Sequence, residues 1–297
     1  MHLRTLIIKN FKSFNGYHRI YLNKGLNIIE GPNGSGKTSL CLAVEFVLFG
    51  NLHEHIPQII NIQHQQTTER NRYIDTEVEL YMVNNEKTCT LSRDFKKYDE
   101  TDLRSYNEHS RYSSPLEPKL TRPIYHELIC IKESTLDKIT GNDPAESEGQ
   151  RTARLLLEIA KENVNRDINL LILDDTLARP EDKARKTLLH KLLKLPLEQL
   201  ILLQNNTSNN ETLQEHNPRI THLNTQMENA TFKTENYPLP AKNLEENTRY
   251  FYHGMYLNAG DKFNENVHGH PYYLKVIEAT PNGSRFDENT ELTLING

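Results

Sequence analysis

Residues 31–38 read GPNGSGKT and match the pattern G-x-x-x-x-G-K-[ST] at every fixed position. Glycines inside this segment let the backbone curl, so that successive N–H groups point inward and form a nest for an anion. Lys37 offers a cation to the outer phosphates of a nucleotide, and the Thr38 hydroxyl can take one position on Mg²⁺. The pattern therefore predicts a nucleotide site made by Asn33, Gly34, Ser35, Gly36, Lys37, Thr38 and Ser39.

The surroundings of this loop support a strand before it and a helix after it. Residues 26–29 are mostly apolar, and apolar residues then recur at helical spacing from Leu40 to Leu48, before Gly50. A helix beginning at the loop aims its positive end at the same phosphates. Further apolar runs at 170–173 and 197–203 are typical of strands buried on both faces. The order of elements predicts an α/β fold of the phosphate-loop nucleoside triphosphatase (P-loop NTPase) type, with a mostly parallel sheet.

Other segments indicate an antiparallel side sheet and a change in composition and periodicity toward the C-terminus. Residues 76–95 alternate in polarity on both sides of Asn84-Asn85, which predicts an antiparallel hairpin in a side sheet. Residues 98–122 are polar, contain two prolines and are expected to form a surface loop, and 124–134 to form a short strand. We expect a nucleotide-binding head over 1–206, an Asn/Thr-rich linker over 207–249, and a small β-type or partly ordered segment over 250–297.

Composition limits the classes of function. The chain has 297 residues and a formal net charge of -5, so the whole molecule lacks the basic footprint of a nucleic-acid binder, although a local basic patch remains open. Three widely separated cysteines favour a reducing compartment over a disulfide framework. No apolar run approaches about 18 residues, so we expect no membrane span and no membrane partner. The N-terminus does not have the pattern of a secretory signal.

Residues 170–175 read LLILDD, an apolar strand that runs into two carboxylates. This is how the metal-holding strand of a phosphate-cleaving ATPase ends. On this interpretation Asp174 holds Mg²⁺ and Asp175 stands in the position of the catalytic base. The alternative is a buried strand followed by an acidic turn.

The segments LIIKNFKSF (6–14) and LNIIEGPNGSGKTSLCLAVEFVLFG (26–50) resemble the N-terminal lobe of SMC-type ATPases, and above all SbcC and its counterparts in DNA double-strand-break repair. The resemblance implies ATP and Mg²⁺ as cofactors, with Lys12 and Ser13 near the nucleotide. It implies an ATP-linked homodimer, in which each ATP lies between the phosphate loop of one chain and a signature motif of the other. It also implies a clamp on double-stranded DNA, a nuclease partner of the SbcD type, and a cytoplasmic (nucleoid) or nuclear location.

The signature and several catalytic positions depart from the pattern of that family. Ser147 and Gly149 match the signature, but Glu148 replaces a glycine between them. A Ser-capped helix is the alternative, because Gln150 follows Ser147 at capping-box spacing. Glu133 stands where the family has a metal-holding Gln, and it could bind Mg²⁺ beside Thr38 and Asp174. Asn205 stands where the family has a His.

These departures predict intact nucleotide binding and slow turnover, with Asp175, Glu133 and Asn205 as the catalytic candidates. The long coiled coil of the family is missing, because Glu133 and Ser147 are only 14 positions apart (147 minus 133). Two alternatives stay open: a nucleotide-binding interaction module with little or no hydrolysis, and another phosphate-loop enzyme such as a kinase, for which residues 98–122 could form a lid.

Overall fold

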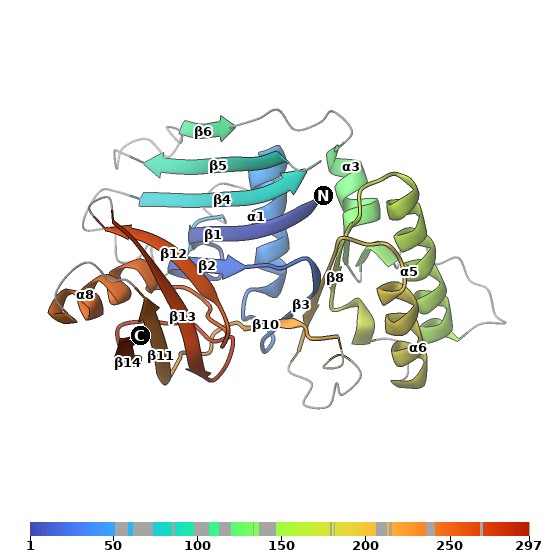
Figure 1. Cartoon of the computed structure of the whole chain (residues 1–297). Coiled ribbons are helices and arrows are strands. Elements are labelled where there is room, and N and C mark those ends of the chain that lie inside the picture. The colour runs from blue at the N-terminus through green and yellow to red at the C-terminus, as the bar shows by residue number, and fades with distance from the viewer. Residues whose placement is uncertain are drawn as a thin grey trace.

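The computed structural model describes residues 1–50, 59–61, 74–84, 87–97, 107–112, 120–132, 134–136, 147–178, 180, 182–205, 213, 216–235, 241–267 and 270–296. These residues form a central parallel sheet, an antiparallel side sheet and a C-terminal sheet (Figure 1). Glu133 falls outside the described residues.

The central sheet has the strand order β10-β3-β9-β8-β7, and all its neighbours pair in parallel. Its strands are β3 (Gly25–Glu30), β7 (Cys130–Lys132), β8 (Leu170–Asp174), β9 (Gln199–Gln204) and β10 (Arg219–His222). Helix α1 (Lys37–Phe49) covers one face, and helices α5 (Glu148–Asn165) and α6 (Asp182–Leu193) cover the other. In β8, Leu170 and Ile172 pack toward α1, whereas Leu171 and Leu173 pack toward α5 and α6. Burial on both faces explains the continuous apolar sequence of this strand.

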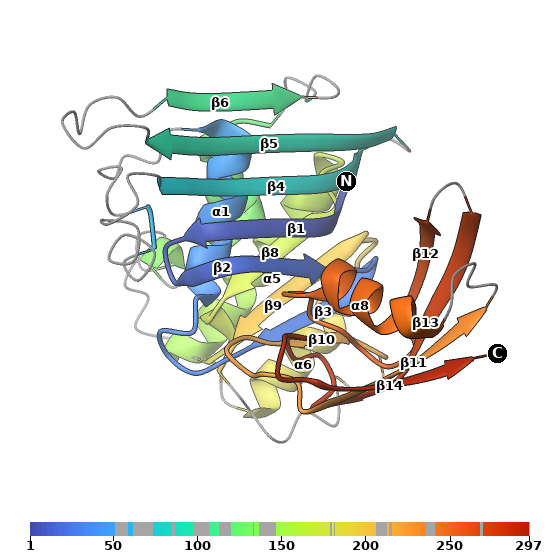
Figure 2. The same ribbon diagram turned by 90° about the vertical axis from the view of Figure 1, so that its left-hand side faces the viewer.

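The side sheet is antiparallel and has the order β2-β1-β4-β5-β6. Its strands are β1 (His2–Phe11), β2 (Phe14–Tyr21), β4 (Ile74–Asn84), β5 (Lys87–Lys97) and β6 (Asn107–Tyr112). Alternate residues such as Leu6, Ile8 and Leu80 are buried in the same core as α1, so that this helix lies between the side sheet and the central sheet (Figure 2).

The predicted α/β fold with a parallel sheet and an antiparallel side sheet is confirmed. The predicted hairpin is also present, with Asn84 paired to Lys87 across its end. The expectation of a loop over the whole of 98–122 is wrong, because 107–112 add the edge strand β6 to β5.

The C-terminal sheet has the order β12-β13-β11-β14. Its strands are β11 (Asn229–Glu235), β12 (Lys262–Val267), β13 (His270–Thr280) and β14 (Glu291–Asn296). Its inner face packs against helix α8 (Ala241–Tyr252) through residues such as Phe232, Tyr252 and Leu274. Its outer face alternates with the inner one along β13, where Tyr272 and Leu274 are buried and Tyr273 and Lys275 are exposed. The C-terminal segment is therefore of the β type.

The interval 207–249, for which we expected a linker, holds β10, β11 and most of α8. Strand β10 pairs with β3 in the central sheet, from Arg219 opposite Asn27 to His222 opposite Glu30. Arg219 is buried. Its guanidinium group compensates for the lost water by donating to the Asp261 carboxylate (Nη2–Oδ2 2.9 Å) and to the Tyr21 carbonyl (Nε–O 2.8 Å). The expected loosely ordered linker is therefore wrong for the residues of this interval that the structure describes.

The segment expected to be a strand at 124–134 is mostly helical. A short helix, α3 (Arg122–Ile124), leads into a π-helical turn (Tyr125–Ile129), and the extended strand β7 that follows is limited to Cys130–Lys132 among the described residues of this segment. Thr121 and Pro123 start the helix, because the Thr121 side chain caps it and Pro fits the first turn. A further short 3-10 turn spans Thr176–Ala178. Within the described residues, no helix is both long enough and apolar enough to cross a membrane.

Candidate nucleotide-binding site

The predicted phosphate loop connects β3 to α1 and closes tightly on itself. Gly34 and Gly36 have positive φ angles of 82° and 106°, which residues with a side chain rarely adopt. The Ser35 amide donates to the Pro32 carbonyl at 3.1 Å. A Cβ atom on Gly31 would lie 2.3 Å from the Ser35 hydroxyl oxygen, so this position also needs a glycine. The loop has the curled backbone that an anion nest requires.

Lys37 is buried at the first turn of α1, and all its donors are used. Its ammonium group donates to the carbonyls of Gly31 (2.8 Å) and Pro32 (3.2 Å), and to Oδ1 of Asn205 (2.9 Å). An ammonium group has three N–H donors and no acceptor. The structure therefore brings Asn205, the residue after β9, next to the lysine of the loop.

Thr38 and Asp174 form a polar pair at the end of β8. The Thr38 hydroxyl donates to Oδ2 of Asp174 at 3.0 Å. Asp174 is buried, and its Oδ1 atom has no hydrogen-bond partner among the described residues. Burial raises the pKa of Asp174, as does the neighbouring charge of Asp175, while the Thr38 hydrogen bond and the charges of Lys132 and Lys37 act in the opposite direction. A buried carboxylate oxygen without a partner, beside a hydroxyl, fits the ligand preference of Mg²⁺.

Asp175 follows directly after β8 in a left-handed conformation, with φ of 55°. Its amide donates to the Leu203 carbonyl of β9 at 3.0 Å, which fixes the start of the turn. Asp tolerates this conformation better than most residues with a side chain. Lys37, Asp174, Asp175 and Asn205 thus lie beyond the carboxyl ends of three neighbouring parallel strands, where ligands bind in open α/β sheets.

The turn between β1 and β2 packs against the phosphate loop. The Ser13 and Ser39 hydroxyl oxygens are 3.1 Å apart. A Cβ atom on Gly36 would lie 3.3 Å from the Cβ of Ser13, so the loop and the turn are in close contact. Lys12 lies in the same turn with φ of 49°, and its amide donates to the Ile59 carbonyl at 2.6 Å. The structure thus brings Ser13 to the loop, and Lys12 precedes it in the same turn.

A family model described as an AAA domain matches residues 5–235, which is more than half of the chain. The chain belongs to the AAA domain family. The matched interval contains the phosphate loop, Asp174, Asp175 and Asn205.

Known proteins similar to this AAA domain include chromosome and DNA-repair ATPases. The chromosome partition protein Smc of Gloeobacter violaceus is 50% identical over 48 residues, which are 16% of this chain and 4% of that protein. The DNA double-strand break repair Rad50 ATPase of Thermoplasma volcanium is 22% identical over 151 residues, which are 49% of this chain and 17% of that protein. This chain thus spans less than a fifth of either relative.

Among solved structures, the SMC head domain from Thermotoga maritima aligns with 69% of this chain and 90% of its own, at 18% identity and a TM-score of 0.47. The resemblance to an SMC/SbcC-type ATPase head is confirmed by the family and its relatives, and it is strong only over a short region.

The signature candidates of this AAA domain lie at the N-terminus of α5, where Ser147 is the N-cap residue. The Ser147 hydroxyl accepts from the Gln150 amide, and the Gln150 side chain accepts from the Ser147 amide, both at 3.3 Å. This is the capping box that the sequence also allowed. Ser147 and Gly149 line a cavity of about 830 Å³ together with residues of α6. Capping does not decide between the two interpretations, since a signature helix can also be capped.

Lys132 is a residue near the site that the sequence did not single out. It ends β7 directly opposite Asp174 in the register of β7 and β8, and its charge lowers the pKa of that carboxyl. The signal was available, because Lys132 ends an apolar run, just as Asp174 does. The pairing of β7 with β8, which the sequence does not show, is what places Lys132 next to Asp174.

Proposed function

We propose that this protein is an SMC/SbcC-like ATPase that binds ATP with Mg²⁺, hydrolyses it slowly, and acts as an ATP-gated clamp in DNA double-strand-break repair or DNA processing. The observation that carries the proposal is the pair of Thr38 and buried Asp174, which faces the phosphate loop with one free carboxylate oxygen. Membership of an SMC/Rad50-like ATPase family supports it.

Each part of the site has a role in this proposal. The loop amides from Asn33 to Ser39 cradle the phosphates, Lys37 neutralises their charge, and Ser13 supports the loop through Ser39. Thr38 and Asp174 are the residues that would hold Mg²⁺, with Glu133 as a third candidate. Bound Mg²⁺ supplies charge neutralisation for the β- and γ-phosphate oxygens.

Two features support slow turnover. Asp175, in the position of the base, is one methylene shorter than Glu and begins a turn in a left-handed conformation. Asn205 offers an amide where the family has a His, and its Oδ1 accepts a hydrogen bond from the Lys37 ammonium group at 2.9 Å. A phosphate that binds Lys37 would compete with Asn205 for the same donors. The same contact favours the second candidate, a nucleotide-binding interaction module with little hydrolysis. A steady-state ATPase assay with and without duplex DNA separates the two, because the clamp requires measurable turnover that DNA alters.

Replacing Lys37 with Ala should weaken Mg²⁺-dependent ATP binding by at least about tenfold, since hydrogen bonds to a charged group contribute about 1.5–3 kcal/mol. Isothermal titration calorimetry measures the change, and circular dichroism checks folding. Lys161→Ala, which removes an exposed lysine of α5, is the matched control and should bind as the wild type does. Equal ATP affinity of Lys37→Ala and the wild type would show that the phosphate loop does not bind ATP.

Dimerisation should depend on ATP, because in the proposed clamp Ser147 and Gly149 complete the site of a second copy. Ser147→Arg should abolish a dimer that light scattering detects with ATP and Mg²⁺. The substitution also removes a helix cap, at a cost of about 1 kcal/mol. Gln150→Ala breaks the same capping box without adding bulk and should leave the dimer intact. A protein that stays monomeric at saturating ATP would exclude this form of clamp.

The partners and the location follow from the same proposal. An ATP-linked homodimer would close on double-stranded DNA and work with a nuclease of the SbcD type, in the cytoplasm (nucleoid) or the nucleus. The names of the relatives, which concern chromosome partition and double-strand-break repair, support a role on DNA.

A further inference from the structure

Three lysines lie next to one another across the outer face of the C-terminal sheet. Lys275 on β13 stands directly opposite Lys262 on β12, and also opposite Lys233 on β11. Directly opposed residues of antiparallel strands share a face, and their Cβ atoms are about 4.5–5.5 Å apart. We call these three residues the lysine row. Like charges placed in this way repel one another, so the row is unfavourable for the sheet alone.

The lysine row is not neutralised by its surroundings. None of the three ammonium groups forms an ion pair with another residue in the part of the chain that the structure describes. The three lysines line a cavity of about 310 Å³, and Glu235 is the one carboxylate among those of its lining residues that the structure describes. The cavity therefore carries a net positive charge on a chain whose formal net charge is -5. This positive charge is not used in ion pairs among the described residues, and it would attract an anion.

An aromatic ring lies beside the row. Tyr273 is two residues before Lys275, so both side chains point to the outer face. Tyr273 is 48% exposed and lines the same cavity. An exposed ring next to several cations is the combination that binds single-stranded nucleic acids, in which bases stack on aromatic rings while cations contact phosphates.

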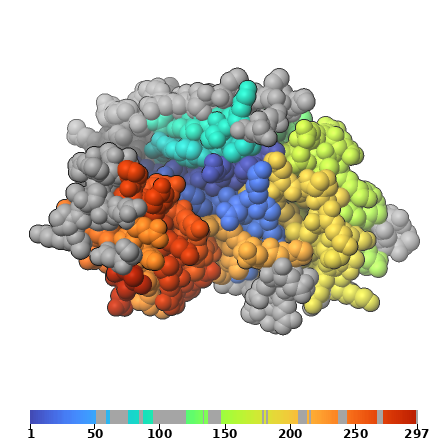
Figure 3. All heavy atoms as spheres, viewed as in Figure 1, coloured from blue at the N-terminus to red at the C-terminus, as the bar shows by residue number. Residues whose placement is uncertain are grey.

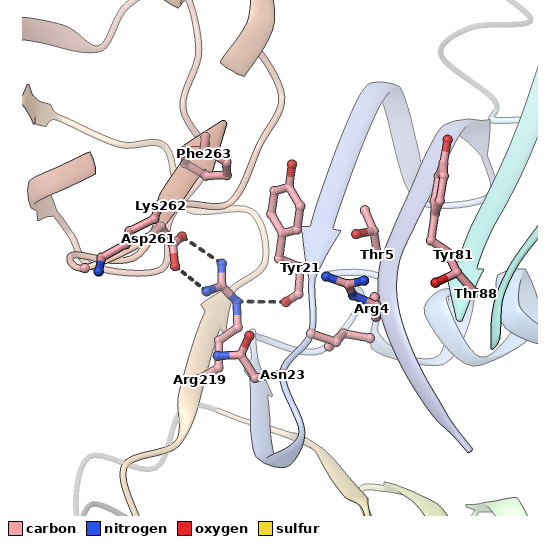
Figure 4. Close-up of a pocket in the computed structure, with 12 residues that line it drawn as sticks. Arg4, Thr5, Tyr21, Asn23, Tyr81, Thr88, Arg219, Asp261, Lys262 and Phe263 are labelled. Carbon is pink, nitrogen blue, oxygen red and sulfur yellow. Dashed lines mark hydrogen bonds and ion pairs between the residues drawn. The ribbon is translucent and has the colours of Figure 1, made fainter. Parts of the chain in front are cut away.

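The row continues into a second cavity. Lys262 and Phe263 also line a cleft of about 530 Å³ between the C-terminal sheet and the side sheet (Figure 4). Figure 3 shows these two parts, orange to red and teal, on either side of a strip of N-terminal residues in blue. The opposite wall of the cleft carries Arg4 and two tyrosines, Tyr21 and Tyr81.

The cleft repeats the combination of cations and aromatic rings. Tyr21 and Tyr81 both stand opposite Thr5 in their registers with β1, which places both rings on one face of the side sheet. Asp261 at the base of the cleft is already paired with Arg219 (Figure 4). The charges left for a ligand are therefore those of Arg4 and Lys262.

We propose that the lysine row and the adjoining cleft bind a single-stranded nucleic acid. The phosphates contact Lys233, Lys275, Lys262 and Arg4, and unpaired bases stack on Tyr273 and on Tyr81, whereas the Tyr21 ring already packs against Phe263. Stacking selects a single strand, because the base faces of a duplex are covered by their neighbours. This surface is separate from the phosphate loop and needs no ATP, so it goes beyond the proposed ATPase.

Fluorescence anisotropy with a labelled oligothymidylate tests the proposal in the full chain without nucleotide. Lys275→Glu should weaken binding at least about tenfold, since it reverses the central charge of the row. Lys275→Ala should lower the slope of log K against log salt by about 0.7, the value for one lost phosphate contact on a single strand. Lys194→Glu, the same change at an exposed site after α6, should leave binding unchanged. Lys275→Glu should also melt no lower than the wild type, because it relieves repulsion between lysines.

The aromatic part of the proposal has its own variants. Tyr273→Leu should weaken binding by about five- to a hundredfold, whereas Tyr273→Phe keeps the ring and should bind as the wild type does. Oligouridylate and duplex DNA serve as further ligands, and oligouridylate shows whether a ribose strand binds as well.

Three results would overturn the proposal: no binding of either single strand at low salt, binding that Lys275→Glu leaves unchanged, or a duplex that binds as tightly as a single strand. Lys37→Ala should keep full oligothymidylate binding. A failure of this surface is thereby distinguishable from a failure of the proposed ATPase, which Lys37→Ala tests through ATP binding alone.

Discussion

Asp175→Asn should reduce ATP turnover to background while ATP affinity stays at the wild-type value. A general base must lie within about 2.6–3.2 Å of the proton that it takes, and an amide cannot take it. Asp175 starts its turn beyond β8, and its amide donates to the Leu203 carbonyl of β9, so we expect its replacement to spare binding. Single-turnover hydrolysis and a parallel binding titration measure the two effects.

The reverse substitution sharpens this test. Asp175→Glu extends the carboxylate by one methylene and should raise turnover by up to about a hundredfold, because misplacement by about 1 Å can cost that much in rate. Asp167→Asn is the matched control, since Asp167 is an exposed Asp with a similar φ of 58° away from the site. Brisk wild-type turnover that survives Asp175→Asn would show that another residue is the base.

The protein should lose about 3 kcal/mol of stability as the pH falls from 6.5 to about 4, through His18 alone. Burial lowers the pKa of His18 to about 4, and the charge of Arg285 acts in the same direction. The unfolded chain takes up a proton near pH 6.5, while the folded protein does not do so until about pH 4. Stability contributed by neutral His18 is therefore complete above pH 6.5 and is lost as the pH falls to about 4.

The contacts of His18 explain why the neutral ring is needed. Nε2 lies 2.9 Å from the Asn15 carbonyl, which can only accept, so Nε2 carries the proton. Nδ1 then accepts from the Tyr256 hydroxyl at 3.1 Å. Urea unfolding over a pH series should show a flatter profile for His18→Gln than for the wild type. His190→Gln, at an exposed position of α6, should keep the wild-type profile. Equal profiles for wild type and His18→Gln would assign the acid sensitivity to other groups.

The parts of the fold that the sequence predicted are those specified by nearby residues. The loop at 31–38 is specified locally, because Gly34 and Gly36 supply the positive φ angles that it needs and helix α1 starts directly after them at Lys37. The strands at 170–174 and 199–204 are apolar throughout because helices cover both faces. In the hairpin of β4 and β5, alternation and a two-residue connection define the pairing.

The parts that could not be predicted depend on distant partners. Strand β10 was hidden because Arg219 looks like a surface residue, and its burial depends on Asp261, 42 positions away. The role of His18 depends on Tyr256, 238 positions away. Lys132 meets Asp174 only because β7 and β8 are neighbours in the sheet. A local pattern can single out one residue, as it does Asp174, but it does not specify the distant residue with which that residue pairs.

The position of β3 between β9 and β10 sets an order of assembly for the newly made chain. Asn27 pairs with Ile201 and Arg219, at separations of 174 positions (201 minus 27) and 192 positions (219 minus 27). The hairpin of β4 and β5 joins neighbours in sequence and can form as soon as it leaves the ribosome, whereas pairing over such separations is slow. The strand that carries the phosphate loop thus acquires its two neighbours only after the chain has been synthesised as far as His222. The proposed binding of ATP would therefore stabilise the product of this late pairing rather than an early intermediate.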